Sequence, residues 1–143
     1  METEALRNEL LTSLYQILEL DAFSVLDDFL QGETLLLRAL MLSEGRPVNP
    51  SDLSDALHLS RSRITAALSA LRRKGLVKMR MSEADRRRQD VTLTEEGLAV
   101  ISEKVGQLNA YFDQLVEGLG GRETHRLIHL IERCVAVMEE EHE

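Results

Sequence analysis

The sequence predicts a mainly α-helical fold with a small β-wing, in the arrangement known as a winged helix-turn-helix. Residues 53–77 contain two short segments with helical apolar spacing, joined by a tight turn. Residues 85–97 then place an arginine-rich turn, an alternating strand and a helix start in direct succession. Longer helical segments precede and follow this region. Together these three features predict the fold class.

Length and composition are typical of one globular domain. The chain has 143 residues, of which 43% are hydrophobic and 29% charged. Residues 1–20 carry acids and lack an uninterrupted apolar run, which predicts neither a signal peptide nor a membrane-spanning helix. The single cysteine, Cys134, cannot form an intrachain disulfide. We therefore expect a cytoplasmic protein without a membrane partner.

Helices are predicted for the first third of the chain. Apolar residues recur at helical spacing from Leu6 to Leu20 and beyond, which predicts a long first helix with a break near Asp21. Thr34–Ser43 is apolar on most sides and is predicted to form a helix at the centre of the core. A glycine and two prolines then leave room only for a very short strand at Val48.

Two capped helices are predicted next. Ser51 is predicted to cap the third helix. Ser60 is predicted to cap a fourth, which runs to about Lys74 and stops at Gly75.

A β-hairpin and a further helix start are predicted after that glycine. Strands are expected at residues 76–81 and 89–93, with a turn at 82–88 between them. Thr94, followed by two glutamates, is predicted to begin a helix, because a hydroxyl cap and acids suit the positive end of the helix dipole.

The last part of the chain is predicted to form two helices. From Leu98 to Leu119 apolar residues repeat in alternating steps of three and four, a seam typical of a helix that packs on another helix. Three glycines at positions 118, 120 and 121 break the pattern. A final helix is expected from about Arg122 to Glu140.

Charge is unevenly distributed along the chain. The formal net charge is -8, yet residues 61–88 hold ten basic and two acidic side chains, a local balance of +8. The remainder holds seven basic and 23 acidic side chains, a balance of -16. A basic segment in an acidic protein is typical of a phosphate-binding surface, although a solvated run of charge is the alternative.

The fourth helix and the wing supply the candidate binding residues. On a helical wheel Ile64, Leu68 and Leu71 share the apolar face, which leaves a polar face of short or basic side chains. Such a face can enter the DNA major groove, and arginines at a hairpin tip suit the minor groove. The candidate DNA-binding residues are Ser60, Arg61, Ser62, Arg63, Thr65, Ala66, Ser69, Arg73, Arg86, Arg87 and Arg88. Asp85 is predicted to be structural, pairing with Arg87 to stiffen the turn.

At this point the chain resembles the multiple antibiotic resistance regulator (MarR) family of winged-helix transcription factors. The family pattern DxR followed by LTxxG appears as Asp85, Arg87, Leu93, Thr94 and Gly97. The resemblance implies a homodimer that binds double-stranded DNA at a pseudo-palindromic operator and usually represses transcription until a small-molecule effector or an oxidant intervenes. It also implies a single domain over 1–143, with helical dimerisation regions at 1–31 and 95–143 and a DNA-binding lobe at 34–94.

Other functions remain as alternatives. A winged-helix protein-interaction module could use the basic surface against an acidic partner, and a metal- or redox-responsive regulator could use His125 with His129, or Cys134. Two histidines four apart on a polar face are more often solvated, and a thiol in an apolar stripe is usually inert core or dimer interface. Neither a nucleophile with its base nor a phosphate-binding glycine loop is recognisable. We therefore predict no enzyme activity, no metal and no cofactor.

Overall fold

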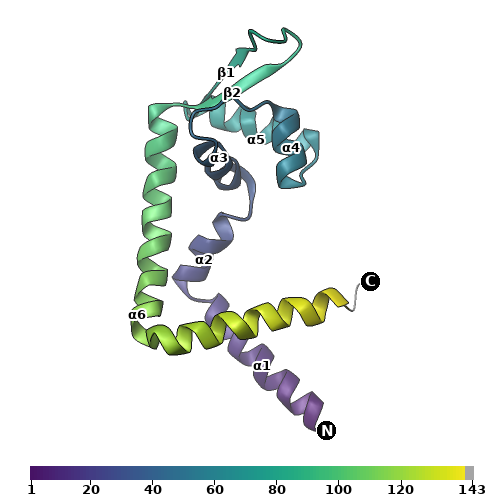
Figure 1. Ribbon diagram of the computed structural model, residues 1–143, viewed down its shortest axis with the longest axis vertical. Coiled ribbons are helices and arrows are strands. Elements are labelled where there is room, and N and C mark those ends of the chain that lie inside the picture. Colours follow the sequence, from purple (N-terminus) through teal and green to yellow (C-terminus); the bar gives the residue numbers. More distant parts are fainter. Residues whose placement is uncertain (141–143) are drawn as a thin grey trace. The chain divides into compact units, whose positions relative to one another are not determined.

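The computed structural model describes residues 1–140 and is mainly helical with one small antiparallel sheet, as the sequence predicts (Figure 1). The elements in chain order are α1 (Glu2–Leu18), α2 (Asp21–Asp28), α3 (Gly32–Leu42), α4 (Pro50–Leu57), α5 (Arg61–Arg73), β1 (Val77–Met81), β2 (Gln89–Leu93) and α6 (Glu95–Glu140). The chain forms two compact units, Met1–Gln107 and Leu108–Glu143, whose boundary falls within α6. The predicted break in the first helix is confirmed between α1 and α2.

Helix α3 lies at the centre of the core of the first unit, which confirms the prediction made from its apolar character. Its Leu36, Leu37 and Leu40 are 0 to 3% exposed. They belong to the same core as the fully buried side chains of α5, Ile64, Leu68 and Leu71, and α3 packs directly on α5. Burying one such side chain stabilises the fold by about 1.5–3 kcal/mol, so this core holds α5 firmly.

Helix α4 begins with a cap that differs from the prediction. Ser51 was expected to cap it, but the cap is Asn49, whose Oδ1 accepts a hydrogen bond from the Asp52 amide at 2.8 Å. Asp52 in turn accepts from the Asn49 amide at 3.3 Å, completing a capping box. The expectation for Ser51 is wrong because the residue before a proline favours extended backbone, the conformation of a cap, and the proline itself suits the first helical position.

The turn between α4 and α5 is as tight as predicted. Helix α4 ends at His58, which adopts the left-handed conformation at φ 55°. Two residues later Ser60 caps α5, as predicted, with its hydroxyl accepting from the Arg63 amide at 3.2 Å. Gly75, at φ 76°, follows the end of α5.

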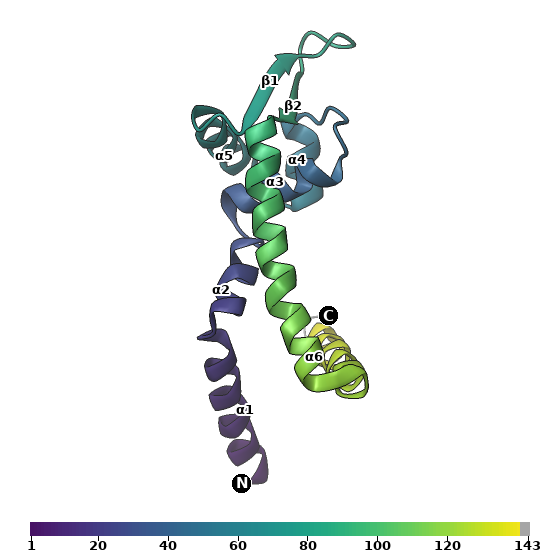
Figure 2. The ribbon, with the colours of Figure 1, turned by 90° about the vertical axis from the view of Figure 1, so that its left-hand side faces the viewer.

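The wing is a two-stranded hairpin. Strands β1 and β2 pair in antiparallel register from Val77 opposite Leu93 to Met81 opposite Gln89. The short strand predicted at Val48 is confirmed as a single bridge to Val91. Viewed from a second side, the hairpin projects from the lobe that α3, α4 and α5 form (Figure 2).

The base of the wing is closely packed against the start of α6. The Thr94 hydroxyl donates to the Gly75 carbonyl at 2.7 Å and accepts from the Gly97 amide at 3.0 Å, which confirms Thr94 as the helix start. The Leu76 carbonyl accepts from the Thr94 amide at 3.1 Å. A Cβ atom on Gly97 would lie only 2.0 Å from that carbonyl oxygen, so only glycine permits this approach.

Helix α6 is interrupted once, at Gly120, whose backbone is non-helical at φ 81° and ψ 164°. The predicted glycine break is therefore confirmed, although Gly118 and Gly121 are themselves helical. In the first unit the predicted seam buries Ile101, whereas in the second unit Leu115 and Leu119 are 36% and 39% exposed. Despite the length of α6, no helix within residues 1–140 is both long and apolar enough to cross a membrane.

Gly97→Ala is expected to destabilise the protein by roughly 3 kcal/mol, because the added methyl overlaps the Leu76 carbonyl and the wing base must shift. Urea denaturation followed by circular dichroism measures the change. Gly106→Ala is the matched control in the same helix, since its methyl would meet nothing within 4 Å. The control should gain about 0.5–1 kcal/mol from helix propensity. Equal stability of the two variants would contradict the close packing.

Candidate nucleic-acid interface

Helix α5 has one buried and one exposed face, as predicted. Ile64, Leu68 and Leu71 face the core. All the candidate binding residues of this helix are exposed: Arg61, Ser62, Arg63, Thr65, Ala66, Ser69 and Arg73. Ser60 is also exposed, but its hydroxyl already caps the helix. The helix therefore offers a polar surface of small and basic side chains, held rigidly by the opposite face.

One hollow, which we call the α5 groove, lies between α5 and the wing. It has a volume of about 260 Å³ and its lining includes Arg61, Thr65 and Ser69 from the candidate set. Arg72 also lines it, together with Met79 and Gln89 of the wing strands. The sequence interpretation missed Arg72, although it lies eleven residues, or three helical turns, after Arg61 and so shares its face.

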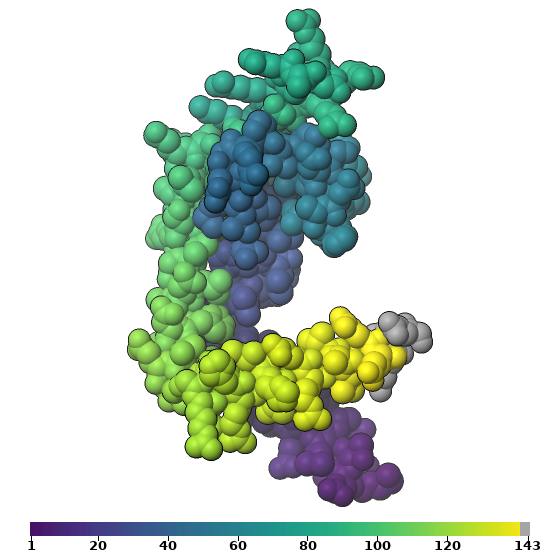
Figure 3. All heavy atoms as spheres, in the orientation of Figure 1, coloured from purple at the N-terminus to yellow at the C-terminus, as the bar shows by residue number. Residues whose placement is uncertain are grey.

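A second hollow, the arginine hollow, joins the start of α5 to the wing tip. It measures about 450 Å³ and is lined by Asn49, Pro50, Ser51, Arg61, Met81, Arg86, Arg87, Arg88 and Gln89. The Arg61 guanidinium donates to the Ser51 hydroxyl at 2.8 Å, which holds it in position. Four arginines from two separate parts of the chain thus surround one hollow. In the space-filling view the side chains of the wing extend beyond the lobe (Figure 3).

Asp85 organises the wing tip. Its Oδ1 accepts from the Arg87 amide at 3.0 Å and lies 3.4 Å from the Arg87 Nε, which confirms the predicted pairing. Its Oδ2 lies 3.7 Å from the Arg88 Nε, a contact the sequence did not predict. Within residues 1–140, Arg86 has neither a hydrogen bond nor an ion pair. One carboxylate therefore offsets only part of the charge at the tip.

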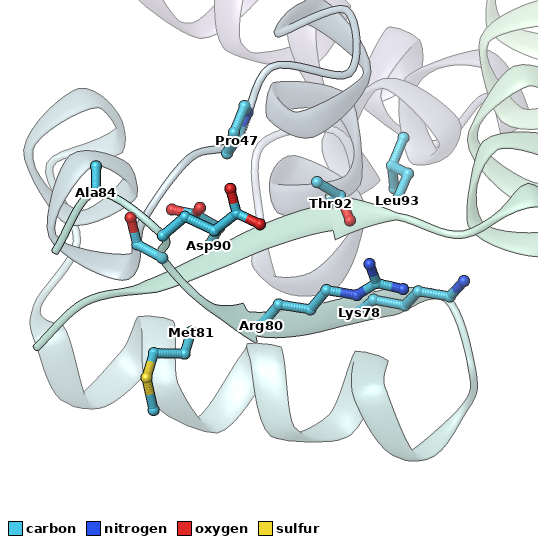
Figure 4. A pocket seen from close by; sticks show the side chains of 10 residues that line it. Pro47, Lys78, Arg80, Met81, Ala84, Asp90, Thr92 and Leu93 are labelled. Atoms are coloured by element: carbon cyan, nitrogen blue, oxygen red, sulfur yellow. The ribbon is translucent and has the colours of Figure 1, made fainter. Parts of the chain in front are cut away.

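The basic segment counted in the sequence is divided between two faces of the wing. Lys78 and Arg80 lie on the face opposite Met79, in a hollow of about 670 Å³ that also includes Met81 and Asp90. There the Lys78 and Arg80 side chains run alongside each other (Figure 4), and Asp90 lies opposite Arg80 on the paired strand. The net charge of +8 counted for residues 61–88 is therefore shared between the two faces of the wing, and each face carries less than that.

Some candidate residues lie outside both hollows. Ser62, Arg63, Ala66 and Arg73 are exposed on α5 but line neither the α5 groove nor the arginine hollow. Lys74, at the end of α5, forms an ion pair with Glu33 of α3 at 2.8 Å. The Glu33 carboxylate therefore offsets part of the Lys74 charge.

The candidate sensor residues are exposed on α6. His125 and His129 are both exposed, and no group of three potential metal ligands occurs in the described part of the chain. Cys134 is also exposed, so the interpretation of this thiol as a core residue is wrong. A place in a dimer interface stays a prediction for it.

Comparisons with known proteins give a consistent result. A family model described as "MarR family" matches residues 30–88, which include α3, α4, α5, β1 and the turn before β2. PapX, an HTH-type transcriptional regulator of Escherichia coli, is 31% identical over 85 residues, covering 59% of this chain and 52% of PapX. The transcriptional repressor MprA of Escherichia coli strain K12 is 28% identical over 111 residues, 76% of this chain and 63% of MprA. The chain thus spans about half to two thirds of these relatives.

Solved structures share the fold. A variant of Staphylococcus aureus MepR bound to an oligodeoxyribonucleotide has a TM-score of 0.61 and 19% identity, covering 92% of this chain and 97% of the MepR chain. MepR bound to ethidium bromide has a TM-score of 0.66 and 18% identity, with coverage of 92% and 95%. At these identities the likeness concerns the fold alone.

Asp85→Ala is expected to loosen the wing tip, because the Arg87 amide loses its acceptor. Amide hydrogen exchange should then accelerate at Arg87, while global stability changes by less than about 1 kcal/mol, as for exposed ion pairs. Glu83→Ala is the matched control, since it removes the same charge from the same turn and the described residues show no bond to Glu83. Equal exchange at Arg87 in both variants would contradict the role given to Asp85.

Proposed function

We propose that this chain, which a MarR family model matches over residues 30–88, is a homodimeric, DNA-binding transcriptional regulator of that family. It acts in the cytoplasm as a repressor of a pseudo-palindromic operator and is released by a small-molecule effector. The observation that carries the proposal is the convergence of Arg61 from α5 with the wing arginines around one hollow. The two named relatives are transcriptional regulators, which supports a role other than catalysis.

The proposed binding mode follows from the shape of the two elements. The B-DNA major groove, about 12 Å wide, admits a helix such as α5, and a hairpin tip with arginines suits the narrower minor groove. Ser62, Arg63, Thr65 and Ser69 are proposed to influence sequence choice, and Arg73, Arg86 and Arg88 to determine mainly affinity and salt dependence. The solved complex of a MepR variant with an oligodeoxyribonucleotide supports DNA as the partner.

The acidic remainder of the chain favours a single orientation on DNA. Outside residues 61–88 the balance is -16, so most other surfaces repel the phosphate backbone. This repulsion discourages encounters in the wrong orientation, while the basic surface attracts the operator.

The exposed apolar residues of the terminal helices support a homodimer. None of the residues of α1 is buried, although Leu6, Leu10, Leu14 and Leu18 recur every four positions. The part of α6 after Gly120 exposes another apolar set, Leu127, Ile128, Leu130, Ile131, Val135, Val137 and Met138. Surfaces of this kind mark interfaces with other chains.

The proposed effector is a small organic molecule. MprA is named a transcriptional repressor, and the complex of MepR with ethidium bromide supports a small organic molecule as effector. A ligand that binds the DNA-free conformation more tightly would lower the affinity for the operator by the same factor.

The DNA contact is tested on an operator selected from genomic fragments by the protein itself. Arg86→Ala with Arg88→Ala should weaken binding by roughly ten-fold or more at about 0.15 M salt and reduce the slope of log K against log salt by about two. Fluorescence anisotropy over a salt series measures both. The control, Arg7→Ala with Arg38→Ala, removes the same charge from α1 and α3 and should change affinity less than about two-fold.

Unchanged operator binding by the wing variant would refute the role of the wing. Equal, weak affinity of the wild type for operator and random DNA at every salt concentration would instead favour a protein-interaction module.

The dimer is tested by analytical ultracentrifugation. Ile131→Glu with Val135→Glu places two charges on side chains that are 53% and 51% exposed and should convert the dimer to monomers at micromolar concentration. His125→Glu with His129→Glu adds the same two acids at the same spacing on the polar face and should remain dimeric. A monomeric wild type, or a dimer in both variants, would contradict the proposed interface.

A further inference from the structure

The arginine hollow concentrates positive charge that the protein itself does not neutralise. Asp85 is shared between Arg87 and Arg88, at 3.4 Å and 3.7 Å. Among residues 1–140, Arg61 is held only by a neutral hydroxyl, that of Ser51, and Arg86 has no bonded partner. Like charges brought together in this way repel one another, so an anion in the hollow would lower the energy of the arrangement.

The hollow is also shaped for a particular kind of anion. Guanidinium groups present planar pairs of donors that match the oxygens of phosphate groups. Ser51 restrains Arg61 and Asp85 restrains the backbone of Arg87, so donors from two elements are held around the same space. The volume of about 450 Å³ lies within the range of small-molecule sites, about 300–1,000 Å³, and exceeds what one phosphate group requires.

The opposite face of the wing provides a contrast. Lys78 and Arg80 also lie together, but two acids, Glu83 and Asp90, line the same hollow, so acids and cations are equal in number there (Figure 4). This face therefore lacks the uncompensated charge that distinguishes the arginine hollow. It offers a pair of cations on the same hairpin that can serve as a control.

We propose that the arginine hollow is an oligophosphate site, which takes a free chain of linked phosphates in the absence of DNA and a backbone phosphate in its presence. The second half of this statement rests on the proposed function, whereas the first does not. Because both anions need the same guanidinium groups, a free oligophosphate competes with the operator. The protein thereby gains a regulatory input that is separate from an effector site among the helices.

Inorganic tripolyphosphate is the probe, and isothermal titration calorimetry at constant ionic strength measures its binding to the DNA-free protein. The wild type should give a saturable isotherm. Arg61→Ala with Arg86→Ala should weaken it by roughly ten-fold or more, because two of the four donor groups are lost. Lys78→Ala with Arg80→Ala removes the same charge from the opposite face and should change the affinity less than about two-fold.

Arg61→Lys with Arg86→Lys keeps the charge, removes the planar donors, and should give an intermediate loss. Urea midpoints equal to that of the wild type establish that all variants fold. No saturation by the wild type, or equal losses in the two alanine pairs, would overturn the proposal, since either result means diffuse attraction.

A second arm separates the two sources of phosphate. Tripolyphosphate should displace a selected operator from the wild type at a concentration where sodium chloride of equal ionic strength does not. If tripolyphosphate saturates the protein but no DNA is bound, the proposed function fails while the free-oligophosphate site stands. If the operator binds and tripolyphosphate does not, the oligophosphate site fails and the proposed function stands.

Discussion

The junction at the base of the wing is the constraint on which the rest of the structure depends. The Thr94 hydroxyl bonds both the Gly75 carbonyl and the Gly97 amide, and Gly97 lies against the Leu76 carbonyl. These contacts hold Gly75, just after α5, next to the start of the wing and the start of α6. Because α5 and the wing leave the same junction, their arginines meet around one hollow. A displaced junction would separate the two elements that make up the interface.

The positions of the charged side chains, more than the net charge of the chain, determine where the surface is positive. The basic segment is divided by the pleat of the hairpin, since alternate residues of β1 face opposite sides. On one face two acids line the same hollow as two cations, whereas on the other Asp85 offsets only part of the arginine charge. Exposed ion pairs contribute little stability, so Asp85 acts mainly by orienting the turn. The same protein can thus carry a negative net charge and a locally positive binding surface.

Much of this arrangement could be predicted from the sequence, because apolar periodicity and caps act locally. The faces of α5, the hairpin, the Thr94 cap and the break at Gly120 all follow such rules. The cap of α4 was wrong because the preference of the residue before Pro50 outweighs the hydroxyl of Ser51. The Arg61–Ser51 bond was not predictable, since it depends on how separate elements pack.

The two kinds of helix in this chain differ in what stabilises them, and this difference bears on regulation. Helices α3 and α5 bury leucines and isoleucine in a shared core, whereas α1 buries nothing. An isolated helix of that length is only marginally stable in water, so α1 needs packing against a further apolar surface, which the partner chain would supply in the proposed homodimer. The lobe with the arginine hollow has its own core and is expected to move as a rigid body. In the proposed homodimer, an effector that alters the packing of the terminal helices would therefore change the spacing of two intact lobes, while an anion in the hollow would act on each lobe separately.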